Sequence, residues 1–297
     1  MASGVLAYVS MVARIKHKTL RLFRLPWFAV VLLCAAPAMP LSAAPLLADI
    51  SITPHQAVYS LALETAKPSS GVVGASGVMF YKWGQVCDGW TVEQRFKLRI
   101  DYDQQDSVDI GSSLATWEST DGLQYRFNER RTRNGDLDEE LRGTAHLDGP
   151  GQGGVAQFIK PESATLTLAP GVLFPTAHTL FLIRSAQANQ QFVARNVFDG
   201  SDVENAGLVS AVIGPPLKPA GGRMPQPYNS PVLQRPSWQI RLAFFPPDSQ
   251  SDQTEPDYEM GMRLLDNGVS QDMLLDYGDY VIRAKLETIA PLSKPAC

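Results

Sequence analysis

Cysteine and histidine are scarce in this chain, with three cysteines and four histidines among 297 residues. A thiol nucleophile needs a base that holds it as a thiolate, and no histidine lies at an informative spacing from a cysteine. The zinc-ligand spacings C-x-x-C and H-x-x-x-H do not occur either. The sequence therefore predicts neither a thiol enzyme nor a metal site, and we expect no cofactor.

The usual catalytic motifs are also missing. The chain has no P-loop, no S-x-x-K and no G-x-G-x-x-G that opens a helix. The GASGV stretch at Gly74 lacks the second glycine of a nucleophile elbow, and the acid-rich stretch from Asp101 to Asp109 lacks the glycine of an EF-hand. We interpret the acidic stretch as a surface loop and His178 as a partly buried structural histidine. The sequence thus predicts no catalytic residue, and we expect that the protein is not an enzyme.

The first 48 positions contain no acidic residue, whereas basic residues gather just ahead of an apolar run. The basic residues are Arg14, Lys16, Lys18, Arg21 and Arg24, and the apolar run extends from Leu25 to Ala36. This run is too short to span a bilayer as a stable helix, and small residues follow it around Ala43. The pattern predicts a signal peptide over residues 1–43, cleaved near Ala43, with translation starting at Met1 or Met11. A lipid anchor at Cys34 is disfavoured because the bulky Leu33 precedes it.

Removal of this leader makes the protein more acidic. The whole chain has 26 basic and 30 acidic residues; without the five basic residues of the leader, 21 remain against 30, a net charge of about −9. Proteins that bind nucleic acids or anionic membranes need a clustered positive field. We therefore expect no nucleic-acid partner.

Removal of the leader also leaves only two cysteines, Cys87 and Cys297. Two thiols in an oxidising compartment usually pair. Cys297 is the last residue, beyond the strand-like run from Tyr280 to Ile289, so a bond to Cys87 would fasten the C-terminus to an early strand. Chain-entropy reasoning assigns so long a loop at most about 5 kcal/mol of stabilisation. The alternative is a pair of buried free thiols.

Alternating apolar and polar residues dominate the rest of the chain, as in Phe96 to Ile100 and Trp238 to Phe244. A period of two buries one face of a strand and leaves the other in water, which is typical of antiparallel sheets. Comparable runs predict strands near residues 56–65, 71–83, 89–101, 107–118, 122–133, 136–147, 153–160, 163–168, 191–198, 207–213, 236–245, 257–265, 269–276 and 279–289. So many strands need two packed sheets or one closed, barrel-like sheet.

Two Asn-Gly pairs, Asn134–Gly135 and Asn267–Gly268, predict tight two-residue hairpins. Folding the chain about the first pair places Arg133 opposite Asp136, Arg131 opposite Asp138, Arg130 opposite Glu139 and Glu129 opposite Glu140. We interpret these charges as solvated cross-strand pairs, each contributing about 0.2 to 1 kcal/mol, and not as a binding patch or a carboxylate active site.

One helix is expected from Pro175 to about Asn189, with Thr176 as its cap and with Leu180, Ile183 and Ala186 on one side. The proline-rich stretch 214–236 and the polar stretch 246–256 predict exposed loops that neither join a sheet nor enter a core. Both loops are expected to be insertions within a single β domain over residues 44–297.

Four stretches of the chain together resemble one known family. They are HQAVYSLAL from His55, GASGVMFYKWGQVCDGWTVEQRFKL from Gly74, LFPTAHTLFLIRSA followed by NVFDGSD, and the ending from LLDYGDYVIRAKL to Cys297. In this order they resemble the cell-envelope integrity protein B family of alphaproteobacteria, over nearly the whole chain after the leader. The long leader and the proline-rich stretch 214–236 depart from the family pattern.

The resemblance implies a periplasmic protein built as a spiral-like, incompletely closed β-barrel of about fourteen strands. It also implies a disulfide between the two positions that Cys87 and Cys297 occupy here, and a role in maintaining the cell envelope without enzymatic activity. The implied partners are periplasmic envelope proteins, which the loops and edges of the β scaffold would recognise.

The alternative function is the carriage or sensing of a lipid or another amphiphile in the mouth of the barrel. An interior filled without a void by Phe96, Trp238, Ile240 and Leu242 would argue against such a carrier. A hydrolase would require His146 or His178 beside a serine and an acid.

Overall fold

The structure is a computed structural model that describes residues 50–203, 206–219, 225–246 and 255–297. The predicted signal peptide, with both possible start sites, lies outside these ranges. The elements are β1 (His55–Ala66), a 3₁₀ turn η1 (Pro68–Ser70), β2 (Val72–Val86), β3 (Gly89–Tyr102), β4 (Val108–Ser119), β5 (Gln124–Arg133), β6 (Asp136–Leu147), β7 (Gly154–Lys160), β8 (Ala164–Leu168), α2 (Pro175–Gln187), β9 (Phe192–Val197), β10 (Gly207–Leu217), a 3₁₀ turn η2 (Pro231–Leu233), β11 (Ser237–Phe245), β12 (Tyr258–Leu265), β13 (Ser270–Asp276) and β14 (Tyr280–Pro291). The prediction of a mainly β fold of about fourteen strands with one α-helix is confirmed.

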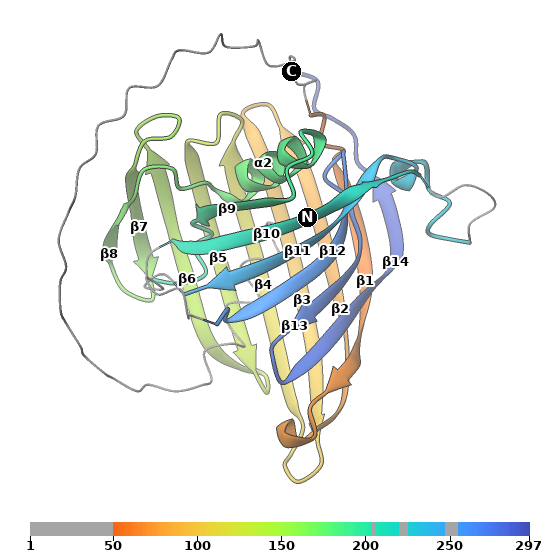
Figure 1. The fold of residues 1–297 in the computed structure, drawn as a ribbon. Coiled ribbons are helices and arrows are strands. Elements are labelled where there is room, and N and C mark those ends of the chain that lie inside the picture. Colours follow the sequence, from red (N-terminus) through yellow and green to blue (C-terminus); the bar gives the residue numbers. More distant parts are fainter. Residues whose placement is uncertain (1–49, 204–205, 220–224, 247–254) are drawn as a thin grey trace, which may run out of the picture.

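All fourteen strands form one antiparallel sheet that does not close. Its order is β8-β7-β6-β5-β4-β3-β2-β1-β14-β13-β12-β11-β10-β9, so the first and last strands of the chain are neighbours in the middle of the sheet. The sheet curls until β9 to β13 lie across from β2 to β6, as Figure 1 shows. Its two edge strands are β8 and β9, which flank α2 in the sequence.

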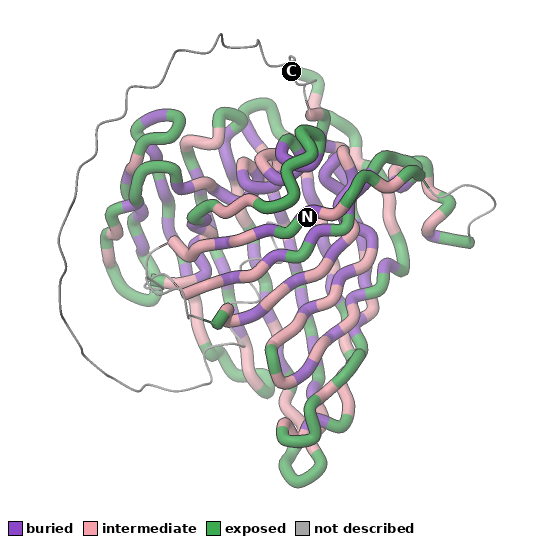
Figure 2. The backbone as a smooth tube through the Cα atoms, in the orientation of Figure 1, coloured by how far each residue is buried: buried purple, intermediate pink, exposed green. Residues whose placement is uncertain are grey.

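The curl of the sheet encloses two hydrophobic cores. The larger core joins inward residues of β1 to β4 with those of β10 to β14, so the two walls of the barrel pack on each other. The smaller core lies under β5 to β8 and contains the aromatic rings of Tyr125, Phe127, Phe158, Phe174 and Phe198. Buried and exposed residues alternate along most strands in Figure 2, which is the pattern that a one-sided core requires.

Helix α2 packs into the mouth of the curled sheet. Leu182, Ile183 and Ala186 belong to the larger core, and Leu180 is half-buried against it. The expected apolar side of this helix is therefore correct at Ile183 and Ala186. The expected cap is wrong, because Thr176 lies inside the first turn and Phe174 occupies the cap position without a side-chain hydrogen bond.

The charged hairpin of β5 and β6 has a different register from the expected one. Asn134 and Gly135 have φ angles of 52° and 91°, and they form the predicted two-residue turn. A bulge then shifts the register, so that Arg131 faces Glu139, Arg130 faces Glu140 and Glu129 faces Leu141. The shift removes the like-charged pair of two glutamates that an unbulged hairpin would contain.

The second Asn-Gly pair does not form a two-residue hairpin. Four residues, 266–269, connect β12 to β13, and within this connection only Gly268 has a positive φ, of 83°. The side chain of Asn267 is buried, and its Nδ2 donates to Val232 O (3.0 Å) and to Thr53 Oγ1 (3.2 Å). Asn267 thus links this loop to two other segments of the chain.

The proline-rich stretch 214–236 is also more ordered than expected in its described parts. Pro216 pairs with Trp238 after a bulge, so the stretch begins within the ladder of β10 and β11. Leu233 is buried in the larger core, and Tyr228 Oη donates to Asp272 Oδ1 (2.8 Å) on β13. The expectation that this stretch neither joins a sheet nor enters a core is therefore wrong. Residues 220–224, and 247–254 of the second expected loop, lie outside the described ranges.

Candidate functional site

The cysteine motif lies at a turn. Cys87 and Asp88 connect β2 to β3, and Cys87 forms a disulfide with Cys297, with 5.7 Å between the two Cα atoms. The tail before Cys297 is held further by Leu292 N, which donates to Pro54 O (2.8 Å). The disulfide therefore fastens the chain end beyond β14 to the tip of the β2–β3 hairpin, and its role is structural.

A buried ionic network lies on the inner face of β5. Arg131 Nη2 donates to Glu129 Oε2 (2.8 Å) and to Ser201 O (2.9 Å), and its Nη1 donates to Glu139 Oε2 (2.5 Å). Glu129 also accepts a hydrogen bond from Ser112 Oγ (3.0 Å). Burial raises the pKa of Glu129, and the neighbouring Arg131 opposes that shift. The network joins β4, β5, β6 and the segment after β9.

The charged residues of this network were predicted from the sequence to lie in solvent. Glu129 and Arg131 are 1% and 4% exposed, so the interpretation of the hairpin charges as solvated pairs is wrong for these two residues. The signal was present in the sequence, because both share the parity of the buried Tyr125 and Phe127 along β5. An alternating strand places all four side chains on one face.

A second buried carboxylate meets the N-terminus of α2. Glu118, at the end of β4, accepts hydrogen bonds from Thr176 N (2.6 Å) and Ala177 N (2.7 Å). Burial raises its pKa to about 7, in spite of these two bonds. A strand residue thus supplies the cap that the helix sequence lacks.

The two histidines considered for a hydrolase, His146 and His178, lie in different environments. His178 is buried on α2, where burial lowers its pKa to about 4, and its Nδ1 has no hydrogen-bond partner among the described residues. The expectation of a partly buried His178 is therefore wrong, since the residue is fully buried. His146 lies exposed on the outer face of β6, 4.0 Å from Asp148. His178 is thus enclosed on α2, whereas His146 lies on the outside of the sheet beside Asp148.

The described residues contain no cluster of three or more His, Cys, Asp and Glu side chains that could hold a metal ion. Over the same ranges, none of the helices has the length and apolar character needed to cross a membrane.

Among the described residues, the free edge of strand β9 forms backbone hydrogen bonds at one end only, and Arg195 of this strand lies 4.5 Å from the centre of the Phe181 ring of α2. Leu173 N donates to Asn196 O (2.9 Å) and Phe198 N donates to Leu173 O (3.0 Å), which caps the last residues of the strand. Along residues 192–195 no described strand pairs with this edge. Because backbone groups alternate in direction, Phe192 and Ala194 direct theirs the same way as Asn196, toward the edge.

Two exposed apolar side chains lie side by side at this edge. Phe192 of β9 and Val212 of β10 are directly paired, and they are 66% and 57% exposed. A flat apolar pair beside unpaired backbone groups is a surface to which an extended chain can add.

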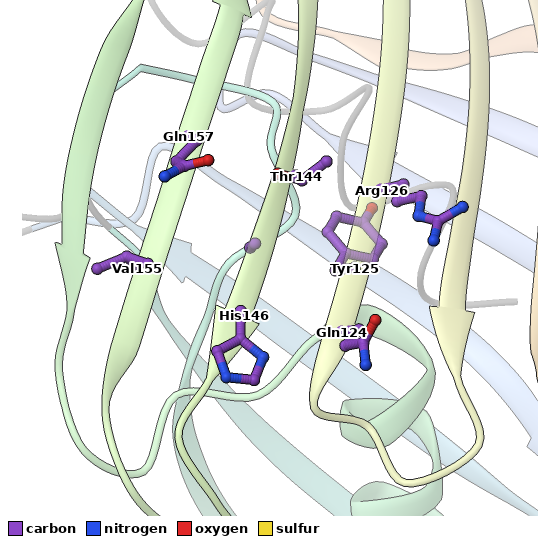
Figure 3. A pocket seen from close by; sticks show the side chains of 8 residues that line it. Gln124, Tyr125, Arg126, Thr144, His146, Val155 and Gln157 are labelled. Carbon is purple, nitrogen blue, oxygen red and sulfur yellow. The ribbon is translucent and has the colours of Figure 1, made fainter.

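The outer face of β5 to β7 is hollowed. The outer hollow, of about 450 Å³, is lined by Gln124, Tyr125, Arg126, Thr144, Ala145, His146, Val155 and Gln157. Figure 3 shows these side chains across three neighbouring strands. A second hollow, of about 310 Å³, lies on the outer face of β11 to β14 and includes Arg263, Asp272 and Arg283. No sequence motif marks either hollow, because each is made by cross-strand register.

The four apolar positions considered for the lining of a carrier lie in the core. Phe96, Trp238, Ile240 and Leu242 are all buried in the larger core. Two polar groups also face this interior, because the Tyr81 hydroxyl and the Gln94 amide are buried opposite each other on β2 and β3, without a partner among the described residues.

Comparison with known proteins agrees with this architecture. A model of the EipB-like family matches residues 47–293. Over 243 residues, the chain is 32% identical to the cell envelope integrity protein EipB of Brucella abortus (strain 2308), covering 80% of this chain and 83% of that protein. A crystal structure of a β-barrel-like protein of a domain of unknown function from Brucella abortus superposes with a TM-score of 0.73 and 30% identity, covering 82% of this chain and 100% of that one.

Proposed function

The chain belongs to the EipB-like family, and we propose that it supports the integrity of the cell envelope as a non-catalytic periplasmic protein that binds other envelope proteins. The similar Brucella protein is named for cell envelope integrity. The EipB-like name describes no reaction.

The periplasmic location is supported by two features of the chain. Its first residues have the basic and apolar pattern of an export signal. The disulfide between Cys87 and Cys297 would persist in an oxidising compartment and would be reduced in a cytosol.

The observation that carries the binding proposal is the open edge at β9. A partner segment in extended conformation would pair with the backbone N–H and C=O of Phe192 and with the N–H of Ala194, and it would place an apolar side chain against Phe192 and Val212. Arg195 limits the length of this contact, because its Nη1 donates to Ala194 O (2.8 Å). The edge therefore suits a short strand of another protein.

The test replaces the apolar pair without touching the core. We expect a Phe192→Ser, Val212→Thr variant to fold normally, to lose its copurifying envelope protein, and to fail to restore detergent resistance in cells that lack the wild-type copy. The matched control is Val73→Ser, Val78→Thr, which alters two exposed valines on the distant strand β2. If the edge variant restores resistance as fully as the control and the wild type do, the β9 edge is not the surface that binds the partner protein.

A carrier of a lipid or another amphiphile is the competing proposal, and the packing of the interior weighs against it. The buried Tyr81 and Gln94 could bind a polar head group, but Phe96 and Leu242 occupy the same core. Native mass spectrometry of protein isolated from the periplasm separates the two proposals, since a stoichiometric lipid adduct would favour the carrier.

A further inference from the structure

The outer hollow of β5 to β7 results from the lengths of the side chains along its rows. The register places Gln124, His146 and Val155 in one row, and Arg126, Thr144 and Gln157 in the next. In the second row a short threonine stands between an arginine and a glutamine, which leaves space above β6. Six of the eight lining residues belong to these two outward rows, and the buried Tyr125 and Ala145 lie between the rows.

Positive charge borders this hollow, although the protein as a whole is acidic. The next outward row contains Asn128, Arg142 and Lys160, all exposed like Arg126. Among the described residues, no acidic side chain forms an ion pair with Arg126, Arg142 or Lys160. Three cations on two adjacent rows attract an anion.

The polar side chains of the hollow are open to a ligand, and an aromatic ring holds one of them, Arg126. The guanidinium of Arg126 lies 4.6 Å from the centre of the Trp117 ring, which fixes its plane at the β4 side of the hollow. The side chains of Gln124, Thr144 and Gln157 have no hydrogen-bond partner among the described residues. The hollow thus offers two amides, one hydroxyl and a planar arginine to a ligand.

The position of the hollow decides between a peptide and a compact ligand. Each of β5, β6 and β7 pairs with a strand on both sides, so their backbone groups are already hydrogen-bonded. A peptide strand could not add there, and only side chains can make contacts. Amide and hydroxyl groups suit sugar hydroxyls, and Arg126, Arg142 and Lys160 suit a carboxylate or phosphate.

We propose that the outer hollow binds an anionic sugar, a carboxylated or phosphorylated hexose unit of an envelope glycan. A volume of about 450 Å³ falls within the range of small-ligand sites and accommodates one or two sugar rings. Such a site would let the protein contact glycan on one face of the sheet while the β9 edge contacts protein.

The test follows the backbone amide signals of the ¹⁵N-labelled protein by nuclear magnetic resonance. Glucose 6-phosphate and glucuronic acid, titrated separately, distinguish phosphate from carboxylate. Glucose, inorganic phosphate and a short polyglutamate peptide are the comparison ligands. We expect at least one charged sugar to shift Thr144, His146 and Gln157 with at least tenfold higher affinity than glucose, inorganic phosphate or the peptide.

Two variants locate the contact. Arg126→Gln should weaken binding of the charged sugar at least tenfold, and Gln157→Ala should weaken it without a matching loss for inorganic phosphate. The matched control is Arg95→Gln, which removes the same charge. Arg95 is also exposed and also lies over an aromatic ring, that of Phe80 on β2. The control should bind as the wild type does.

Three results would overturn the proposal. In the first, neither charged sugar shifts signals at the outer hollow. In the second, inorganic phosphate or polyglutamate binds as tightly as the sugars do. In the third, the Arg126 and Arg95 variants bind the sugar equally well. None of these results bears on the β9 edge, so this proposal and the proposed function fail separately.

Discussion

At the scale of single residues, the interior of this protein contains buried, desolvated charges. Each of Glu129 and Arg131 needs the other, because an ionised group left without its partner in a core costs several kcal/mol. Their hydrogen bonds to Ser112 and Ser201 connect β5 to the neighbouring strand β4 and to the segment after β9.

Replacing the arginine of this network should be severe. We expect Arg131→Met to lower the free energy of unfolding by about 3 to 5 kcal/mol, because it leaves Glu129 buried without its cation. Arg241→Met removes the cation of an exposed pair with Glu259 and should cost less than about 1 kcal/mol. Urea unfolding followed by tryptophan fluorescence measures both, and equal losses would show that the network is not buried.

The carboxyl of Glu118 predicts a dependence of stability on pH. Its folded-state pKa of about 7 lies above the ordinary value of 4.5, so the folded protein holds this proton more tightly than the unfolded chain. The resulting stabilisation is complete below pH 4.5 and is lost as the pH rises through about 7. Relative to Glu118→Gln, the wild type should lose on the order of 2 to 3 kcal/mol over this range.

The comparison with Glu118→Gln removes the contribution of the histidines to the pH dependence, because both proteins contain the same histidines. Burial lowers the pKa of His55 and His178 to about 4, so their contribution has the opposite sign and is lost as the pH falls. Unfolding midpoints at intervals from pH 4.5 to pH 8 give the difference, and a difference that does not change with pH would contradict the raised pKa.

At the scale of elements, α2 depends on packing and on Glu118 more than on its own sequence. Leu182 is fully buried in the larger core, whereas Leu180 is half-buried beside it. We expect Leu182→Ala to cost about 2 to 5 kcal/mol and Leu180→Ala clearly less, measured by the same unfolding experiment. The reverse order would mean that the helix is seated with another face inward.

The elements also show where sequence patterns suffice and where they do not. Alternation predicted each described strand and Asn134–Gly135 predicted its hairpin, since both depend on neighbours within a few residues. The bulge near Asp138 was not predictable, because it arises from the burial of Arg131 against Glu139 across the hairpin. The pairing of β1 with β14 and the outer hollow depend on contacts between distant parts of the chain.

At the scale of the whole molecule, the disulfide closes a very long loop of the chain. Cys87 and Cys297 are 210 positions apart, so the bond restricts the unfolded chain strongly. We expect a Cys87→Ser, Cys297→Ser variant to lose up to about 5 kcal/mol of stability, with its strands still formed in circular dichroism. A variant as stable as the oxidised wild type would show that the bond does not constrain the unfolded state.

The open sheet connects the fold to the proposed function, because a closed barrel would leave no edge for a partner strand. The most direct measurement is crosslinking in living cells, with a photoreactive phenylalanine in place of Phe192 and, in the control, in place of the exposed Val73. The account predicts a discrete adduct with one envelope protein at position 192 and none at position 73. If the protein with the photoreactive residue at position 192 still supports the envelope and gives no adduct on illumination, the account is contradicted.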